Sequence, residues 1–81
     1  MTLTIVTRSN VGYMNSKCEL ECDKEFAIEV AKKMFNVSKN NKYVEIYQGD
    51  KLYYGDSQIK PWIKVMLQDS EWKVEQLYEY L

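Results

Sequence analysis

The fold is decided between residues 17 and 36, which read KCELECDKEFAIEVAKKMFN. Charged and apolar residues alternate from Lys17 to Cys22, and this period of two is typical of a β-strand with one buried face. Beyond Asp23, a residue type that commonly caps helices, apolar residues recur at intervals of three and four, which is the helical period. They are Phe26, Ala27, Val30, Ala31 and Met34. The stretch therefore predicts a half-buried strand, then a helix that ends near Asn36 and covers one face of a sheet.

A second strand is predicted upstream, in the β-branched segment of residues 2–7. Its rough alternation turns Leu3 and Ile5 inward. Residues 8–16 contain the turn formers Ser, Asn and Gly, and we expect them to form a loop. The strand over 2–7 should then pair with the strand over 17–22.

A second hairpin is predicted downstream of the helix, between residues 43–47 and 52–54. A three-residue loop, Gly49 to Lys51, places Ile46 opposite Tyr54 and gathers the aliphatic side chains on the helix-facing side. The residues that this register turns toward the helix are Val44, Ile46, Leu52 and Tyr54. The outer face receives Glu45 and three tyrosines, which are Tyr43, Tyr47 and Tyr53.

In the last third of the chain, the two segments 61–67 and 70–81 can each be interpreted as a strand or as a helix. Residues 61–67 suit a strand that begins at Pro61, although their apolar residues also fit one side of a helix; we predict the strand. Residues 70–81 follow the helical period after a cap at Asp69 or Ser70, and we predict a helix there, with a strand through Trp72 and Val74 as the alternative. The predicted class is therefore one α+β domain over residues 1–81, with a mainly antiparallel sheet in the order ββαβββα and a helix on one face.

Composition sets limits on partners and location. Hydrophobic residues make up 46% and charged residues 28% of the 81 residues, as in a small globular protein. The net charge of −1 gives no global attraction to nucleic acid or to an acidic membrane. No apolar run approaches the roughly 20 residues that span a bilayer, and the first residues lack a basic leader. We therefore expect a cytoplasmic protein without membrane association.

The residues that usually carry catalysis or bind metals are scarce. The chain has no histidine, which removes the commonest general base and metal ligand. Its only thiols, Cys18 and Cys22, lie roughly 13 Å apart on a strand, too far to bond to each other or to share a metal. Three glycines provide no phosphate-binding loop. We expect no catalytic residues, no metal and no cofactor, and hence a protein that is not an enzyme.

The surplus of aromatic residues favours a binding function. Tyr and Trp are enriched at protein interfaces, and a small core gains stability from a partner or a second copy. The leading hypothesis is a small non-enzymatic protein-binding module, with a homodimer as one form of partnership. Ten lysines against one arginine suggest an AT-rich genome, and hence a phage or mobile-element inhibitor of a host protein. The candidate interface residues are Tyr13, Tyr43, Tyr47, Tyr53, Trp62 and Trp72.

The alternative hypothesis is binding of single-stranded nucleic acid. Tyrosines on an outer sheet face stack unpaired bases in several RNA-binding modules, and nearby lysines neutralise phosphates. The candidate lysines lie in a stretch without acidic residues and are Lys32, Lys33, Lys39 and Lys42. Either hypothesis requires that the predicted C-terminal helix does not cover the tyrosines.

Overall fold

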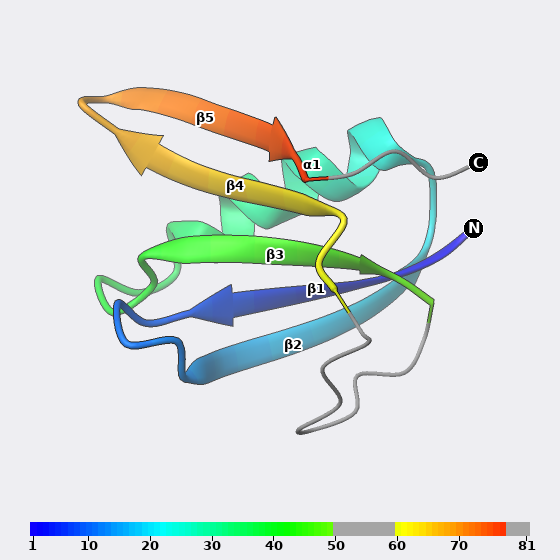
Figure 1. Cartoon of the computed structure of the whole chain (residues 1–81), viewed down its shortest axis with the longest axis horizontal. Helices are drawn as coiled ribbons and strands as arrows, with labels where there is room; N and C mark the ends of the chain where they lie inside the picture. The colour runs from blue at the N-terminus through cyan, green and yellow to red at the C-terminus, as the bar shows by residue number, and fades with distance from the viewer. Residues whose placement is uncertain (50–59, 78–81) are drawn as a thin grey trace.

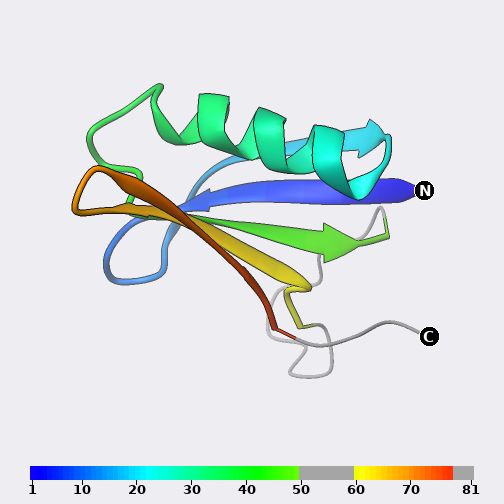
Figure 2. The same ribbon diagram turned by 90° about the horizontal axis from the view of Figure 1, so that it is seen from above.

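In the part of the chain that the structure describes, five strands form one sheet in the order β2-β1-β3-β4-β5, with every neighbouring pair antiparallel. The structure is a computed structural model that describes residues 1–49 and 60–77. Within these residues a single helix, α1, lies on one face of the sheet (Figures 1 and 2), so the α+β class predicted from the sequence is confirmed. In chain order the elements are β1 (Thr2–Arg8), β2 (Met14–Glu21), α1 (Lys24–Phe35), β3 (Tyr43–Gln48), β4 (Ile63–Gln68) and β5 (Glu71–Gln76).

The helix forms where its sequence period predicts it. The Asp23 carboxylate accepts a hydrogen bond from the backbone N–H of Phe26 at 2.8 Å, which satisfies a donor that the first turn leaves free. Ala27 and Ala31 are fully buried against the sheet. Phe26, predicted to share their face, is instead exposed, because it lies about 100° around the helix from Ala27. Among the described residues, no helix is long and apolar enough to cross a membrane.

The N-terminal hairpin pairs the two strands that the sequence predicts. Leu3 lies opposite Leu20 and Ile5 opposite Cys18, and both β1 residues are fully buried. The predicted loop over residues 8–16 is too long, because β1 continues through Arg8 and β2 begins at Met14. A register shift between Thr7 and Arg8 accommodates this irregular end of the ladder.

The two central strands, β1 and β3, bury both of their faces. On the helix side, Ile5 lies opposite Ile46, and both belong to the hydrophobic core. On the other side, Thr4 and Val6 are also fully buried, and the Thr4 hydroxyl donates to the carbonyl oxygen of Gly49 at 2.8 Å. The sequence prediction assigned only the helix side to the core, because the threonines of β1 resemble a solvent-exposed face.

Strand β4 confirms the strand predicted after Pro61. Its pairing with β3 places Ile63 opposite Ile46, while β1 occupies the other edge of β3. Ile63 therefore takes the position that the predicted hairpin gave to Tyr54. The second strand of that hairpin, residues 52–54, lies outside the described residues, as does most of its loop.

The predicted helix over residues 70–81 is wrong for residues 71–76, which form β5, the alternative left open by the sequence. Asp69 and Ser70 have φ angles of 53° and 65° and make a two-residue turn between β4 and β5. Positive φ at both positions is the geometry of a type I′ hairpin turn, which matches the twist of the flanking strands. Pairing with β4 places Val74 opposite Val65, so tertiary contacts decide against the helical period.

Candidate functional site

The sheet is wider than the helix that covers it. A helix with its side chains is about 10–12 Å across, whereas neighbouring strands lie about 4.8 Å apart. Accordingly α1 packs on β1, β3 and β4 and leaves the edge strand β5 to its side. Figure 2 shows β5 diverging from the line of α1 at the edge of the sheet. The helix-facing side chains of β5 are therefore only partly covered.

These side chains form an apolar surface together with the last turn of the helix. The Trp72 ring meets the Phe35 ring edge to face, with the centroids 5.4 Å apart and the planes at 79°. Leu67, opposite Trp72 in the β4–β5 ladder, is 39% exposed, and Val74 on the same face is 45% exposed. We call Phe35, Leu67, Trp72 and Val74 the α1–β5 strip.

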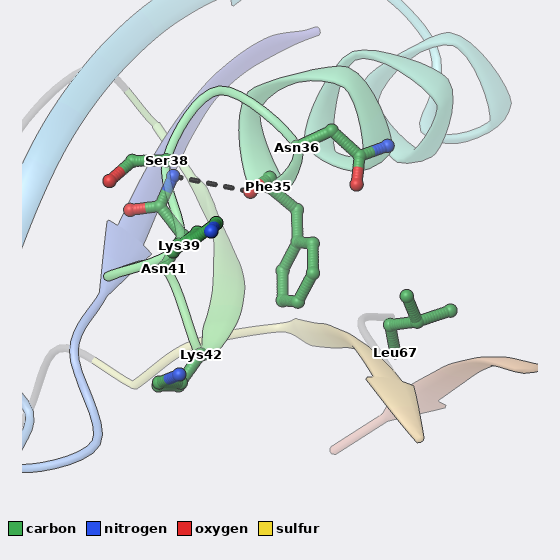
Figure 3. Close-up of a pocket in the computed structure, with 7 residues that line it drawn as sticks. All are labelled: Phe35, Asn36, Ser38, Lys39, Asn41, Lys42 and Leu67. Atoms are coloured by element: carbon green, nitrogen blue, oxygen red, sulfur yellow. Dashed lines mark hydrogen bonds between the residues drawn. The ribbon is translucent and has the colours of Figure 1, made fainter. Parts of the chain in front are cut away.

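One end of the α1–β5 strip opens into a pocket of about 510 Å³. The Phe35 ring and the Leu67 side chain face each other across it, and the loop after α1 forms the remaining wall (Figure 3). The residues that line it are Phe35, Asn36, Ser38, Lys39, Asn41, Lys42 and Leu67. Two lysines and no acidic residue belong to this set, which makes the pocket electropositive.

Asn41 holds the pocket loop in place. Its side-chain amide nitrogen donates to the backbone carbonyls of Met34 at 2.9 Å and Phe35 at 3.4 Å, in the last turn of the helix, where carbonyls lack the usual helical partner. Its side-chain oxygen accepts a hydrogen bond from Asn15 of β2 at 2.9 Å. Asn41 is buried and its hydrogen bonds are internal, so its role in the pocket is structural.

Positive charge continues along the side of α1 that faces β5. The Lys32 ammonium lies 5.8 Å from the centroid of the Trp72 ring, within the range of a cation–π contact, and 3.7 Å from the Glu29 carboxylate. About two helical turns before Lys32, the Lys24 ammonium donates to the Gln76 side chain at 2.9 Å. The acidic residues of β5 alternate with Trp72 and Val74 and so lie on the opposite face. The α1–β5 strip is thus apolar with a basic rim.

The opposite face of the sheet carries a closed polar network instead of exposed tyrosines. The Arg8 guanidinium donates from Nε to the Glu45 carboxylate at 2.7 Å and from a terminal nitrogen to the Tyr47 hydroxyl at 3.0 Å. The Tyr47 hydroxyl in turn donates to the same Glu45 oxygen at 3.0 Å. Tyr47 is only 5% exposed, so its ring has no free face. Tyr43 is partly buried, and the Lys64 ammonium lies 4.7 Å from its ring centroid.

Burial and hydrogen bonding together determine the pKa values of Arg8 and Tyr47 in this network. Burial raises the pKa of Tyr47 above its ordinary value, against the opposing effect of its hydrogen bond with Arg8. For Arg8, burial lowers the pKa, but the hydrogen bonds to Glu45 and Tyr47 outweigh it and the net pKa is raised. Arg8 therefore stays charged and Tyr47 neutral at physiological pH, and the network is a structural one.

The structure separates the predicted interface residues from one another. Tyr13 is 75% exposed in the turn between β1 and β2, whereas Trp62 is 7% exposed and belongs to the core. Trp62 and Tyr47 consequently offer almost no surface to a partner. Tyr53 lies outside the described residues. Of the predicted interface residues, Trp72 is the one that lies in the α1–β5 strip.

The structure brings together three of the four predicted lysines. Lys39 and Lys42 line the pocket, and Lys32 lies over Trp72. Lys33 is exposed and belongs neither to the pocket lining nor to the contact with Trp72. The sequence prediction missed Phe35, Leu67 and Val74, because their grouping depends on β5 being a strand. The alternation of Trp72 and Val74 with charged residues was the signal that could have identified them.

Cys18 lies in β2 and Cys22 directly follows it, and both are free and partly buried. Burial raises the pKa of the Cys22 thiol, which lowers its thiolate fraction and its reactivity. Within residues 1–49 and 60–77, no three Cys, Asp or Glu side chains gather closely enough to hold a metal ion. Comparison with protein-family models, curated proteins and solved structures gives no match for this chain.

Proposed function

We propose that this chain is a small non-enzymatic protein-binding module and that the α1–β5 strip with its basic pocket is the docking surface. The observation that carries this proposal is the combination of exposed Leu67 and Val74 with Lys39 and Lys42 and without an acidic residue in the pocket lining. Apolar contacts supply affinity, and the lysines select for carboxylates. The fitting partner is an acidic protein segment with aliphatic or aromatic side chains.

The aromatic geometry favours protein over nucleic acid as the partner. Stacking of a base requires a free ring face, but Phe35 and Lys32 contact the Trp72 ring and Tyr47 is buried. The exposed side chains that remain in the α1–β5 strip, Leu67 and Val74, are aliphatic and suit an apolar peptide side chain. A module of this kind would inhibit its partner by covering the partner's acidic segment. This agrees with the inhibitor of a host protein that the phage-like composition suggests.

The proposal is tested by selecting binders from a displayed library of random peptides and measuring their affinity by calorimetry. We expect the selected peptides to combine Asp or Glu with Leu or Phe. The double variant Lys39→Glu/Lys42→Glu should bind them about tenfold more weakly, because two attractive contacts become repulsive. Rising salt should weaken wild-type binding for the same reason.

The control is Lys33→Glu, which makes the same kind of charge change at a single site on α1, outside the α1–β5 strip and the pocket lining. We expect it to change peptide affinity less than twofold. Selected peptides without acidic residues, or an equal loss of affinity in Lys33→Glu and in the pocket variant, would argue against this docking surface.

A second candidate function is binding of single-stranded nucleic acid, because Lys32, Lys39 and Lys42 are gathered at one end of the molecule. Phosphate contacts by these lysines would give binding that weakens steeply with salt. Titration of a labelled mixed-sequence oligonucleotide at low salt separates the candidates. Binding that is lost in the pocket variant, together with failure of the peptide selection, would favour nucleic acid.

A further inference from the structure

Strand β5 is one of the two edges of the sheet. It is the last strand in the order β2-β1-β3-β4-β5, so one of its edges faces no strand of the described part of the chain. Main-chain N–H and C=O groups along such an edge can pair with another chain. The question is therefore which strand fits there.

The hairpin geometry determines which main-chain groups point to the open edge. In a two-residue hairpin, the pair that closes the turn exchanges both hydrogen bonds, and this pattern recurs at every second residue. Here the closing pair is Gln68 with Glu71, and the Leu77 N–H donates to the Trp62 carbonyl at 2.8 Å in the same alternation. The main-chain groups of Trp72 and Val74 consequently point away from β4.

The side chains of β5 complement a second copy of β5. With two antiparallel copies centred on Val74, each Lys73 lies opposite a Glu75 of the other copy, and Val74 lies opposite Val74. Opposite charges in directly facing positions stabilise a strand pair, and this register forms two such pairs. It also places Trp72 of each copy beside Gln76 of the other, on the helix side. In this register, opposite charges face each other, and the outward main-chain groups of Val74 in the two copies can bond to each other.

Other self-pairing registers fit less well. Centring on Lys73 places two lysines opposite each other and sets Glu71 opposite Glu75, so like charges face each other throughout. Centring on Trp72 shortens the overlap, because the turn at Asp69 and Ser70 ends the strand. Charge repulsion excludes Lys73 as the centre and the short overlap excludes Trp72, so Val74 is the favoured centre of the three.

The other edge strand, β2, is less suited to pairing. Its ladder with β1 has a register shift between Thr7 and Arg8, and such irregularities turn an edge away from incoming strands. At its other end, Glu21 forms an ion pair with the N-terminal ammonium of Met1 at 2.6 Å. At the start of β2, Asn15 is hydrogen-bonded to Asn40 and Asn41.

We propose that two copies of this chain form a homodimer by antiparallel pairing of their β5 strands, centred on Val74. The sheet then continues across the two copies, with both α1 helices on the same face and the two α1–β5 strips side by side. This inference goes beyond the proposed peptide-binding function and stands independently of it. A monomer can still bind acidic peptides, and a dimer can form without doing so.

Charge exchange at Lys73 and Glu75 tests the dimer and its register. Sedimentation equilibrium of the wild type should give about twice the monomer mass of 9.7 kDa, falling toward the monomer mass on dilution. Lys73→Glu alone and Glu75→Lys alone each place like charges opposite one another twice, and should weaken dimerisation about tenfold. The double variant Lys73→Glu/Glu75→Lys restores both pairs, and its affinity should return to within about threefold of wild type.

Two further variants keep the test decisive. Val74→Pro removes an N–H from the open edge without touching the ladder to β4 and should yield a monomer with an unchanged far-ultraviolet circular dichroism spectrum. Lys17→Glu makes the same charge change on β2 and should leave the dimer intact. A wild type that is monomeric at every concentration overturns the proposal. So does a dimer that responds to Lys17→Glu instead of Lys73→Glu, or a double variant that fails to recover.

Discussion

Asn41 shows how one polar side chain can link three parts of a small fold. It joins the last turn of α1, the loop that walls the pocket, and the start of β2 through Asn15. Buried polar groups are stabilising only when their hydrogen bonds are made, so these links depend on one another. No periodicity in the sequence distinguishes Asn41 from Asn40 beside it, because the difference arises from nonlocal burial.

We expect Asn41→Ala to lower the free energy of unfolding by about 1 kcal/mol, because it removes the hydrogen bonds of Asn41 to the Met34 carbonyl and to the Asn15 amide. Urea denaturation followed by circular dichroism measures this loss. The neighbouring change Asn40→Ala is the control, since the Asn40 side chain is exposed and only its carbonyl accepts from Asn15. Equal losses in the two variants would contradict the role assigned to Asn41.

The largely buried polar network on the sheet face opposite α1 predicts a pH dependence above neutrality. The pKa of Tyr47 is raised by burial above the value of about 10 expected in the unfolded chain. The folded state therefore holds the Tyr47 proton more tightly, and stability from this group is complete below pH 10 and is lost as pH rises through the folded pKa. Tyr47→Phe should remove this part of the alkaline loss.

The measurement is urea unfolding of the wild type and of Tyr47→Phe at a series of pH values from neutral to alkaline. We expect the difference in stability between the two proteins to be constant below pH 10 and to shrink above it. Tyr13→Phe is the control, because Tyr13 is exposed in a turn. A difference that is flat over the whole alkaline range would show that Tyr47 ionises equally easily in both states.

At the level of elements, local signals were sufficient for α1 and misleading for β5. For α1, the cap at Asp23 and the apolar period of the following residues agree with each other and with the tertiary packing. For β5, Asp69 and Ser70 resemble a helix cap, and the residues after them also repeat at helical spacing. The strand forms because Trp72 pairs with Leu67 and Val74 with Val65 across the ladder. The free energy that favours the strand therefore comes from contacts with β4 and not from the propensity of the segment itself.

The turn between β4 and β5 should be improved by glycine. Ser70 has a φ of 65°, a region that costs a residue with a Cβ atom and that glycine enters freely. We expect Ser70→Gly to raise the free energy of unfolding by about 1 kcal/mol, measured by urea denaturation. Gln68→Gly, at the last residue of β4, is the control and should lower stability, since glycine weakens a strand. A loss of stability in Ser70→Gly would contradict the turn geometry.

At the level of the whole molecule, the sequence predicts the class of fold but not the position of the candidate site. Alternation and period place most of the strands and the helix, so the core around Ile5, Ala31 and Ile46 follows from the sequence. The α1–β5 strip does not follow, because it is the area that one helix fails to cover on a five-stranded sheet. That area depends on strand order, and strand order is set by long-range pairing.

The strand order also has a consequence for how the chain folds. The β1–β2 and β4–β5 hairpins join neighbours in sequence, and local pairings of this kind close quickly. The β1–β3 ladder, in contrast, brings Ile5 beside Ile46 across the whole of β2 and α1. Its loop-closure entropy must be overcome before the central contacts form, so we expect the docking of β3 onto β1 to limit the folding rate. Until that step, both hairpins have unpaired edges, and folding competes with association at high protein concentration.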